Sequence, residues 1–202
     1  MVLHGIRRSG KTYLMFMLFK ECKDALYVNF EDERLSGITL SDLDDLYLNY
    51  LMIKEPERPV MFLDEIQNIK GWEKFVARLQ SKVKFIISGS NASLLSSEYA
   101  TVLTGRYIAF RVHPLSFKEV LGAKKIKSLN PSITEQKAVL LNHFYQFLDY
   151  GGFPDASLNR DPLLLKSYFE GILYRDILPR FTIQNNVALE TLAHYLISNP
   201  VS

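Results

Sequence analysis

Residues 5–13 read GIRRSGKTY, directly after a four-residue apolar stub. The spacing of glycine, four residues, glycine, lysine and a hydroxyl is typical of a loop that wraps around phosphate, because the glycines let backbone N–H groups converge on phosphate oxygens. A helix that starts at such a loop adds its positive N-terminal end. The apolar residues before and after the loop favour a strand–loop–helix nucleotide site over a chance glycine turn.

Within this loop, two side chains have distinct expected roles. Lys11 would reach the β- and γ-phosphates, and the Thr12 hydroxyl would hold Mg²⁺. Arg7 and Arg8 lie inside the loop, so neutralisation of phosphate charge explains them without DNA. The candidate nucleotide-binding residues of the loop are Gly5, Ile6, Arg7, Arg8, Ser9, Gly10, Lys11, Thr12 and Tyr13.

A second motif, VMFLDEIQ at residues 60–67, places two acids at the end of an apolar strand. Asp64 stands where a carboxylate can hold Mg²⁺, and Glu65 stands where a base can orient and deprotonate an attacking water. The alternative is a pair of acids that only cap a strand. With a phosphate loop upstream, two adjacent acids favour hydrolysis over binding alone.

A third motif, ISGSNASLL at residues 87–95, ends another strand with polar residues. Asn91 or Ser90 could lie between the Mg²⁺ site and the γ-phosphate and sense that phosphate, so Asn91 joins the nucleotide-binding candidates. Ordinary helix capping by Asn91 or Ser93 explains the same residues equally well.

Composition excludes several other classes of protein. The 202 residues are 48% hydrophobic with a net charge of +2, enough for one sizeable core and a small second domain but without the charge of a dedicated nucleic-acid binder. The four histidines show no metal-ligand spacing, and the single Cys22 rules out an internal disulfide. No apolar run reaches the roughly 18 residues of a membrane span, and no signal-type segment is present. We expect a cytoplasmic protein with no membrane partner.

Short apolar runs alternate with amphipathic helices up to about residue 115. The strand candidates are residues 25–30, 60–65, 84–90 and 106–112, all predicted to be buried and parallel. Two apolar stripes at helical spacing lie between these strands. The first comprises Leu43, Leu46, Tyr47, Tyr50 and Leu51, and the second comprises Trp72, Phe75, Val76 and Leu79. Ser41 and Asp44 are the expected N-cap of the first helix and its capping partner. The helix after the phosphate loop is apolar nearly all round and is predicted to be enclosed. This alternation predicts an α/β fold, a parallel sheet covered on both faces.

After Pro114 the pattern becomes helical. We predict helices at residues 134–149, 162–178 and 188–198, the second opened by Asp161 and Pro162 as N-cap and first turn. We place a boundary near residues 116–122, which gives a phosphate-loop core at 1–117 and an all-helical domain at 118–202.

Taken together, these motifs resemble a known family. The stretches GIRRSGKTYLM, YVNFEDERL, FLDEIQNIKGWEKFVARL, SGSNASLLSSE, LTGR and PLSFKE occur in the order seen in AAA-like ATPases abundant in archaea, which belong with the STAND-type regulatory NTPases. GGFP and YFEGILYRDI look like the helical segment of that family. The resemblance covers nearly the whole chain.

The resemblance implies a P-loop fold with a five-stranded parallel sheet in the order 5-1-4-3-2 and a small helical lid domain. It implies ATP and Mg²⁺ as cofactors, with Lys11 and Thr12 on the nucleotide and Asp64 on the metal. It also implies Glu65 as the catalytic base and Asn91 or Ser90 as the first sensor.

Two arginines match positions from which a finger could reach a γ-phosphate. Arg106 of LTGR could stabilise transition-state charge, and a finger acting in trans would require a homo-oligomer. The alternative for Arg106 is a strand-edge arginine paired with an acid. Arg175 of YRDI is a similar candidate from the lid, and a packing salt bridge is its alternative.

Members of this family usually carry a few dozen residues before the phosphate loop, which often line the base pocket. They also continue into a winged-helix module and a further, often nuclease-like, domain. We therefore expect the chain to be a fragment. An apolar stripe near its end suits the first helix of such a module and, if exposed, would attract a partner or a dimer contact; it comprises Leu189, Leu192, Ala193, Leu196 and Ile197.

The hypothesis that follows is a Mg²⁺-dependent ATPase that acts as a conformational switch relayed to an effector. ATP is preferred over GTP by resemblance, since no Asn-Lys-x-Asp motif occurs. One rival is a non-hydrolysing nucleotide-binding module that docks protein or DNA partners. A phosphotransferase acting on a small molecule is a weaker rival, because the helical region offers no evident acceptor-binding lid.

Overall fold

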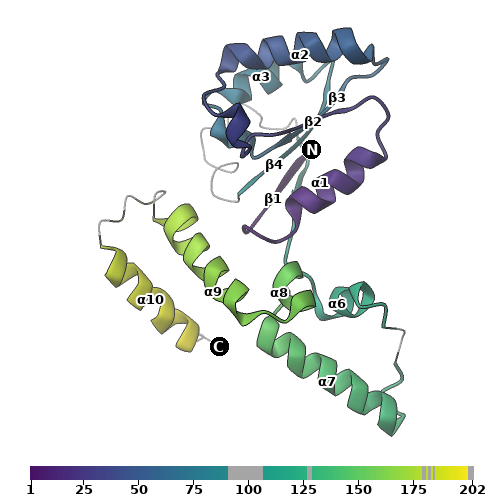
Figure 1. The fold of residues 1–202 in the computed structure, drawn as a ribbon, viewed down its shortest axis with the longest axis vertical. Coiled ribbons are helices and arrows are strands. Elements are labelled where there is room, and N and C mark those ends of the chain that lie inside the picture. Colours follow the sequence, from purple (N-terminus) through teal and green to yellow (C-terminus); the bar gives the residue numbers. More distant parts are fainter. Residues whose placement is uncertain (91–106, 127–128, 179–180, 182, 184, 200–202) are drawn as a thin grey trace. The chain divides into compact units, whose positions relative to one another are not determined.

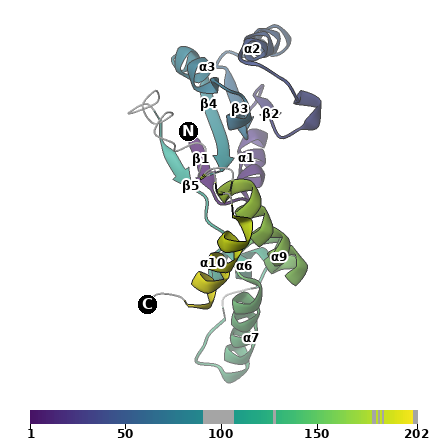
Figure 2. The ribbon, with the colours of Figure 1, turned by 90° about the vertical axis from the view of Figure 1, so that its left-hand side faces the viewer.

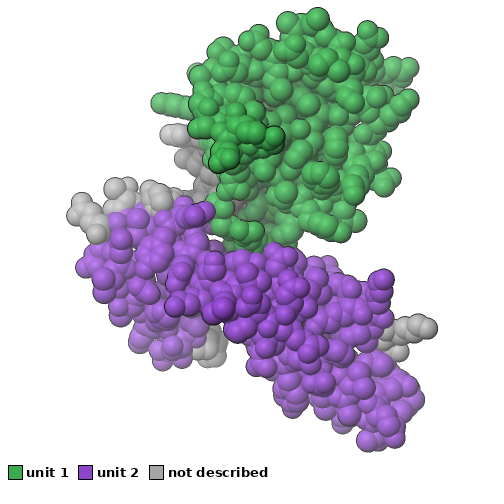
Figure 3. All heavy atoms as spheres, in the orientation of Figure 1, with its two compact units in different colours: residues 1–113 green, residues 114–202 purple. Residues whose placement is uncertain are grey.

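The computed structural model describes residues 1–90, 107–126, 129–178, 181, 183 and 185–199 (Figure 1). The chain divides into two compact units, Met1–His113 and Pro114–Ser202, which are coloured separately in Figure 3. Unit 1 is the α/β part and unit 2 is helical in its described residues.

Five parallel strands form the centre of unit 1. They are β1 (Val2–Gly5), β2 (Leu26–Asn29), β3 (Val60–Asp64), β4 (Lys84–Ser90) and β5 (Ala109–Arg111). Hydrogen bonds join them in the order β2-β3-β4-β1-β5, which can be followed across Figure 2. This is the predicted order 5-1-4-3-2 counted from the opposite edge, so the α/β P-loop fold is confirmed. Because all five strands run the same way, the segments that follow β1, β3 and β4 leave the sheet at one edge.

Helices cover both faces of this sheet (Figure 1). They are α1 (Lys11–Lys20), α2 (Leu40–Lys54) and α3 (Trp72–Leu79), with short turns η1 (Glu33–Leu35) and η2 (Ile66–Asn68). Alternate strand residues face opposite ways: Met61 and Leu63 join a hydrophobic cluster with α2 and α3, whereas Phe62 joins a second cluster with α1. This period of two is what a sheet buried on both faces requires.

Two predictions about the exposure of these elements are wrong. The helix after the phosphate loop is not enclosed: α1 buries Lys11 and Met15 but leaves Tyr13 73% and Met17 53% exposed. The predicted buried strand at 106–112 is also exposed over β5, because β5 is an edge strand whose only described partner is β1.

The N-cap of α2 also differs from the prediction. Thr39 is the N-cap, and its backbone N–H donates to the Asp42 carboxylate at 2.7 Å. Ser41 lies inside the helix, and Asp44 instead forms an ion pair with Arg78 of α3. Both Thr39–Asp42 and Ser41–Asp44 have the spacing of a capping box, so spacing alone could not choose between them.

The described residues of unit 2 form a series of helices. They are α6 (Phe117–Ala123), α7 (Thr134–Tyr150), α8 (Pro154–Asn159), α9 (Pro162–Gly171), η3 (Ile172–Ile177) and α10 (Asn186–Ser198). Asp161 caps α9 as predicted, accepting from the Leu163 N–H at 2.9 Å. The predicted helix 162–178 changes at Gly171 into the π-helical turn η3, a wider backbone spacing that an apolar stripe does not reveal.

The turn between α7 and α8 packs against the segment that enters α6. The Leu115 N–H donates to the Gly152 carbonyl at 2.7 Å, and a Cβ atom at Gly152 would collide with the Leu115 carbonyl oxygen. Backbone therefore approaches backbone at a distance that only glycine permits. By contrast, α7 and α10 bury no side chain among their described residues.

Candidate functional site

The loop between β1 and α1 has the backbone of a phosphate cradle. Arg8 (φ 66°) and Gly10 (φ 98°) both adopt the left-handed conformation, which turns successive N–H groups to one side. Gly5 lies so close to the Val112 carbonyl oxygen that a Cβ atom would collide with it. Because Gly10 is the N-cap of α1 and has no side chain, the first turn of that helix receives no side-chain cap. The helix therefore presents its N-terminal N–H groups to the loop.

Lys11 lies over this loop and is only 5% exposed. Its Nζ donates to the carbonyl oxygens of Gly5 at 3.1 Å and Ile6 at 3.2 Å. Ser9 is buried as well, and its hydroxyl has no hydrogen-bond partner among the described residues. An ammonium group, a buried hydroxyl without a partner and converging N–H groups form the donor set that an anion such as phosphate needs.

Asp64, the last residue of β3, is completely buried. Its Oδ1 accepts from the Ser88 hydroxyl of β4, and its Oδ2 accepts from the Tyr27 hydroxyl of β2 at 2.9 Å. Burial, followed by the charge of Asp64, raises the pKa of Tyr27. A buried carboxylate is stable only when its oxygens are paired, so the two hydroxyls keep Asp64 at the end of its strand.

Glu65 follows in a strained backbone conformation, with φ 53°. Its carboxylate accepts a hydrogen bond from the Gln67 amide of η2 at 2.5 Å. Burial is the largest influence and raises the pKa of Glu65; the Gln67 hydrogen bond and the Lys11 charge oppose this, while Asp64 and Glu31 reinforce it. Lys11 and Asp64 therefore both act electrostatically on Glu65, which places the three residues in one site.

The phosphate loop is also tied to the end of β2. Arg7 forms an ion pair with Glu31, with 2.9 Å between Nη1 and Oε1, and the Glu31 N–H donates to the Asn29 side chain at 2.9 Å. The sequence predicts that Arg7 neutralises phosphate charge, and it does not indicate Glu31. The stretch YVNFED was part of the family resemblance but offered no signal for this pair.

The remaining predicted site residues are distributed as follows. Thr12 and Tyr13 are exposed on the first turn of α1, Ser90 ends β4, and Arg175 is exposed on η3 in unit 2. Asn91 and Arg106 lie outside the described residues, so their predicted roles stay predictions.

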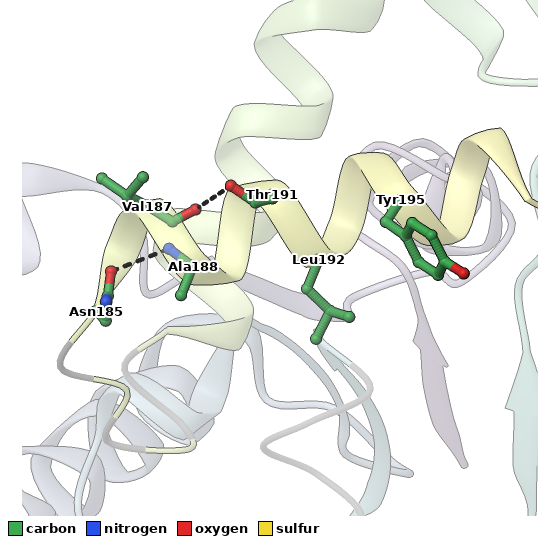
Figure 4. Close-up of a pocket in the computed structure, with 6 residues that line it drawn as sticks. All are labelled: Asn185, Val187, Ala188, Thr191, Leu192 and Tyr195. Atoms are coloured by element: carbon green, nitrogen blue, oxygen red, sulfur yellow. Dashed lines mark hydrogen bonds between the residues drawn. The ribbon is translucent and has the colours of Figure 1, made fainter.

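A shallow hollow of about 520 Å³ runs along α10 (Figure 4). Its lining residues are Asn185, Val187, Ala188, Thr191, Leu192 and Tyr195. Because they all belong to one helix and its N-cap, and none carries a carboxylate or a cation, the hollow has no catalytic equipment. Within the described ranges, no cluster of three or more His, Cys, Asp or Glu side chains could hold a metal, and no helix is long and apolar enough to cross a membrane.

A family model described as an AAA domain matches residues 1–121, more than half of the chain. The chain belongs to this AAA-domain family. The match contains the phosphate loop, the acid pair at the end of β3 and the strands β1 to β5.

Relatives of this AAA-domain chain occur in distant organisms. It is 41% identical to the uncharacterized protein MJ1544 of Methanocaldococcus jannaschii over 206 residues, covering 98% of this chain and 46% of that protein. It is 32% identical to an uncharacterized protein of Haemophilus influenzae over 211 residues, covering 98% and 51%. The chain thus spans about half the length of the curated relatives it matches.

Among solved structures, the chain is similar to the RuvB Holliday junction branch migration motor of Thermotoga maritima. The TM-score is 0.46 at 18% identity, covering 96% of this chain and 61% of RuvB.

Proposed function

We propose that this AAA-domain chain is a Mg²⁺-dependent ATPase that uses hydrolysis as a conformational switch. The observation that best supports this proposal is the convergence of Lys11, Asp64 and Glu65 at the edge of the sheet where the phosphate loop begins. A lysine above a phosphate cradle, a buried carboxylate and a second carboxylate of raised pKa are the three groups that nucleotide hydrolysis requires.

The residues fit a magnesium nucleotide. Lys11 and the N–H groups of the loop would bind the phosphates, and a Thr12 hydroxyl with an Asp64 carboxylate oxygen is an oxygen-only donor pair of the kind that Mg²⁺ prefers. When bound, the metal supplies positive charge against the phosphate oxygens. Few side chains would be needed, since Mg²⁺ usually keeps several waters and takes phosphate oxygens as ligands.

Hydrolysis would run by in-line attack of water on the γ-phosphorus. Glu65 takes a proton from the attacking water as the new P–O bond forms, and the bond to the β–γ bridging oxygen breaks. ADP leaves, and inorganic phosphate carries the water oxygen. Lys11 stabilises the charge that develops on the phosphates. In this proposal Arg106 is the finger and Asn91 is the sensor.

The test is calorimetric titration of ATP with Mg²⁺, together with phosphate release. We expect Lys11→Ala to weaken binding about 30-fold or more, the cost of removing a desolvated charge contact. Glu65→Gln should bind ATP like the parent and release phosphate on the order of 10²- to 10⁴-fold more slowly, the usual contribution of a general base. Removing Mg²⁺ with a chelator should stop phosphate release.

Lys20→Ala is the matched control, because Lys20 lies at the opposite end of α1. It should bind and hydrolyse ATP like the parent. If the parent binds ATP without turnover, the non-hydrolysing nucleotide-binding module is the better description. If the parent and Lys11→Ala bind alike, the loop is not the nucleotide site and the proposal fails.

A further inference from the structure

The turn η2, directly after the acid pair, carries two amide side chains with different contacts. Gln67 Nε2 donates to Glu65 Oε2 at 2.5 Å, whereas Asn68 Nδ2 donates to the backbone carbonyl of Phe30 at 3.0 Å. Asn68 therefore fastens the turn to the segment after β2. Gln67 is directed at the carboxylate proposed to act as the base.

The contact with Gln67 fixes the orientation of the Glu65 carboxylate. Glu65 has φ 53°, and its N–H lies 3.4 Å from the Ser88 hydroxyl, at the long limit of a hydrogen bond. Among the described residues, only Gln67 forms a hydrogen bond to the Glu65 side chain. Without it, the carboxylate would be free to rotate about its side-chain bonds.

The carbonyl oxygen of the Gln67 side chain is a buried acceptor. Gln67 Oε1 is buried and has no hydrogen-bond partner among the described residues. A buried acceptor without a partner destabilises the fold, so such groups in folded proteins call for an explanation. Because Nε2 is committed to the Glu65 carboxylate, Oε1 remains an acceptor for which none of the described residues supplies a donor.

We propose that Gln67 is the water-positioning residue of this site, with its N–H holding the Glu65 carboxylate and its Oε1 accepting a hydrogen bond from the attacking water. This inference rests on the proposed ATPase function. One water proton goes to Glu65 and the second is directed at Gln67 Oε1, so a lone pair of the water oxygen faces the γ-phosphorus. Gln67 exchanges no proton or electron, and the products remain ADP and inorganic phosphate.

The test compares Gln67→Met with Asn68→Leu, two substitutions that replace neighbouring amides by apolar side chains of similar length. We expect Gln67→Met to lower kcat on the order of 10- to 10³-fold, as loss of one positioned donor does in other sites, with Kd for ATP within about 2-fold of the parent. We expect Asn68→Leu to keep kcat and to lower the Tm, because its hydrogen bond only anchors the turn.

The outcomes separate this inference from the proposed function. If the parent hydrolyses ATP and Gln67→Met keeps the parent kcat, the role of Gln67 is overturned while the ATPase function stands. A loss of kcat in Gln67→Met accompanied by weaker ATP binding and a lower Tm, matched by Asn68→Leu, would assign Gln67 a structural role and also overturn the inference. If the parent releases no phosphate, the proposed function and the role of Gln67 fail together.

Discussion

At Asp64, a completely buried carboxylate depends on two hydroxyl groups from neighbouring strands. Ser88 lies on β4 and Tyr27 on β2, so the acid is held from both sides of β3. The Tyr27 ring contacts Phe16 and Phe19, with centroid distances of 5.1 and 5.7 Å. These contacts fix the ring, and the fixed ring brings the hydroxyl to the carboxylate.

Tyr27→Phe should therefore destabilise the chain. The ring contacts are retained, but one oxygen of a buried carboxylate loses its donor, which costs about 1–3 kcal/mol. The measurement is the free energy of unfolding from urea titration followed by circular dichroism. Tyr145→Phe removes a hydroxyl from a ring that is 60% exposed and should change the free energy by less than about 0.5 kcal/mol. Equal stabilities for Tyr27→Phe and the parent would show that the hydrogen bond contributes nothing.

Some residues of the candidate site can be predicted from the sequence, because their chemical type and their spacing indicate a role in binding or hydrolysing a nucleotide. Lys11, Asp64 and Glu65 are such residues, since each follows a recognisable strand or loop signal. Tyr27 could not be found in this way, because 37 positions separate it from Asp64 and any apolar strand can contain a tyrosine. Gln67 is close to Glu65 in sequence, but its contact depends on the positive φ of Glu65, which residue type does not indicate.

Among the elements, the approach of Gly152 to Leu115 has the clearest energetic consequence. Gly152→Ala should destabilise unit 2 by about 1–3 kcal/mol, because the added methyl group collides with backbone that cannot rotate away. The measurement is amide hydrogen exchange across α6 and α8, where protection should fall.

Gly122→Ala is the matched substitution for this prediction. Gly122 lies in α6, and a Cβ atom there meets nothing within 4 Å. Alanine should stabilise this helix by about 0.5–1 kcal/mol through its higher helix propensity, so protection in α6 should rise. If both variants lower protection equally, the collision at Gly152 is not the cause.

The elements themselves were predicted where one pattern dominates. The apolar runs predicted β2, β3 and β4 closely, and the Trp72–Leu79 stripe became α3. Short elements were harder: α6 has a capping box between Ser116 and Glu119, yet its sequence is too short and polar for a clear apolar stripe. The exposed side of α1 could not be foreseen, because periodicity does not show which apolar residues find a neighbour.

For the molecule as a whole, the two hydrophobic clusters lie entirely within unit 1. Residues 1–113 should therefore fold without unit 2, because every described side chain of these clusters precedes His113. Far-UV circular dichroism of this shorter chain should show a cooperative thermal transition. A spectrum without structure, or a gradual loss of signal, would show that unit 1 depends on unit 2.

Strand alternation predicts a parallel sheet, but it does not specify which strands are neighbours. The order β2-β3-β4-β1-β5 came from the family resemblance and was confirmed by the hydrogen-bond pattern. Physical reasoning on composition alone leaves several strand orders open, since each would bury the same apolar runs.

The position of Trp72 has a practical consequence. It is the single tryptophan of the chain, it is 1% exposed within the cluster formed with α2 and α3, and it follows the turn that carries Gln67. Intrinsic fluorescence excited near the red edge of tyrosine absorption therefore comes from one known location in unit 1. The emission wavelength therefore reports whether water has entered this core, and the measurement needs no label attached to the protein.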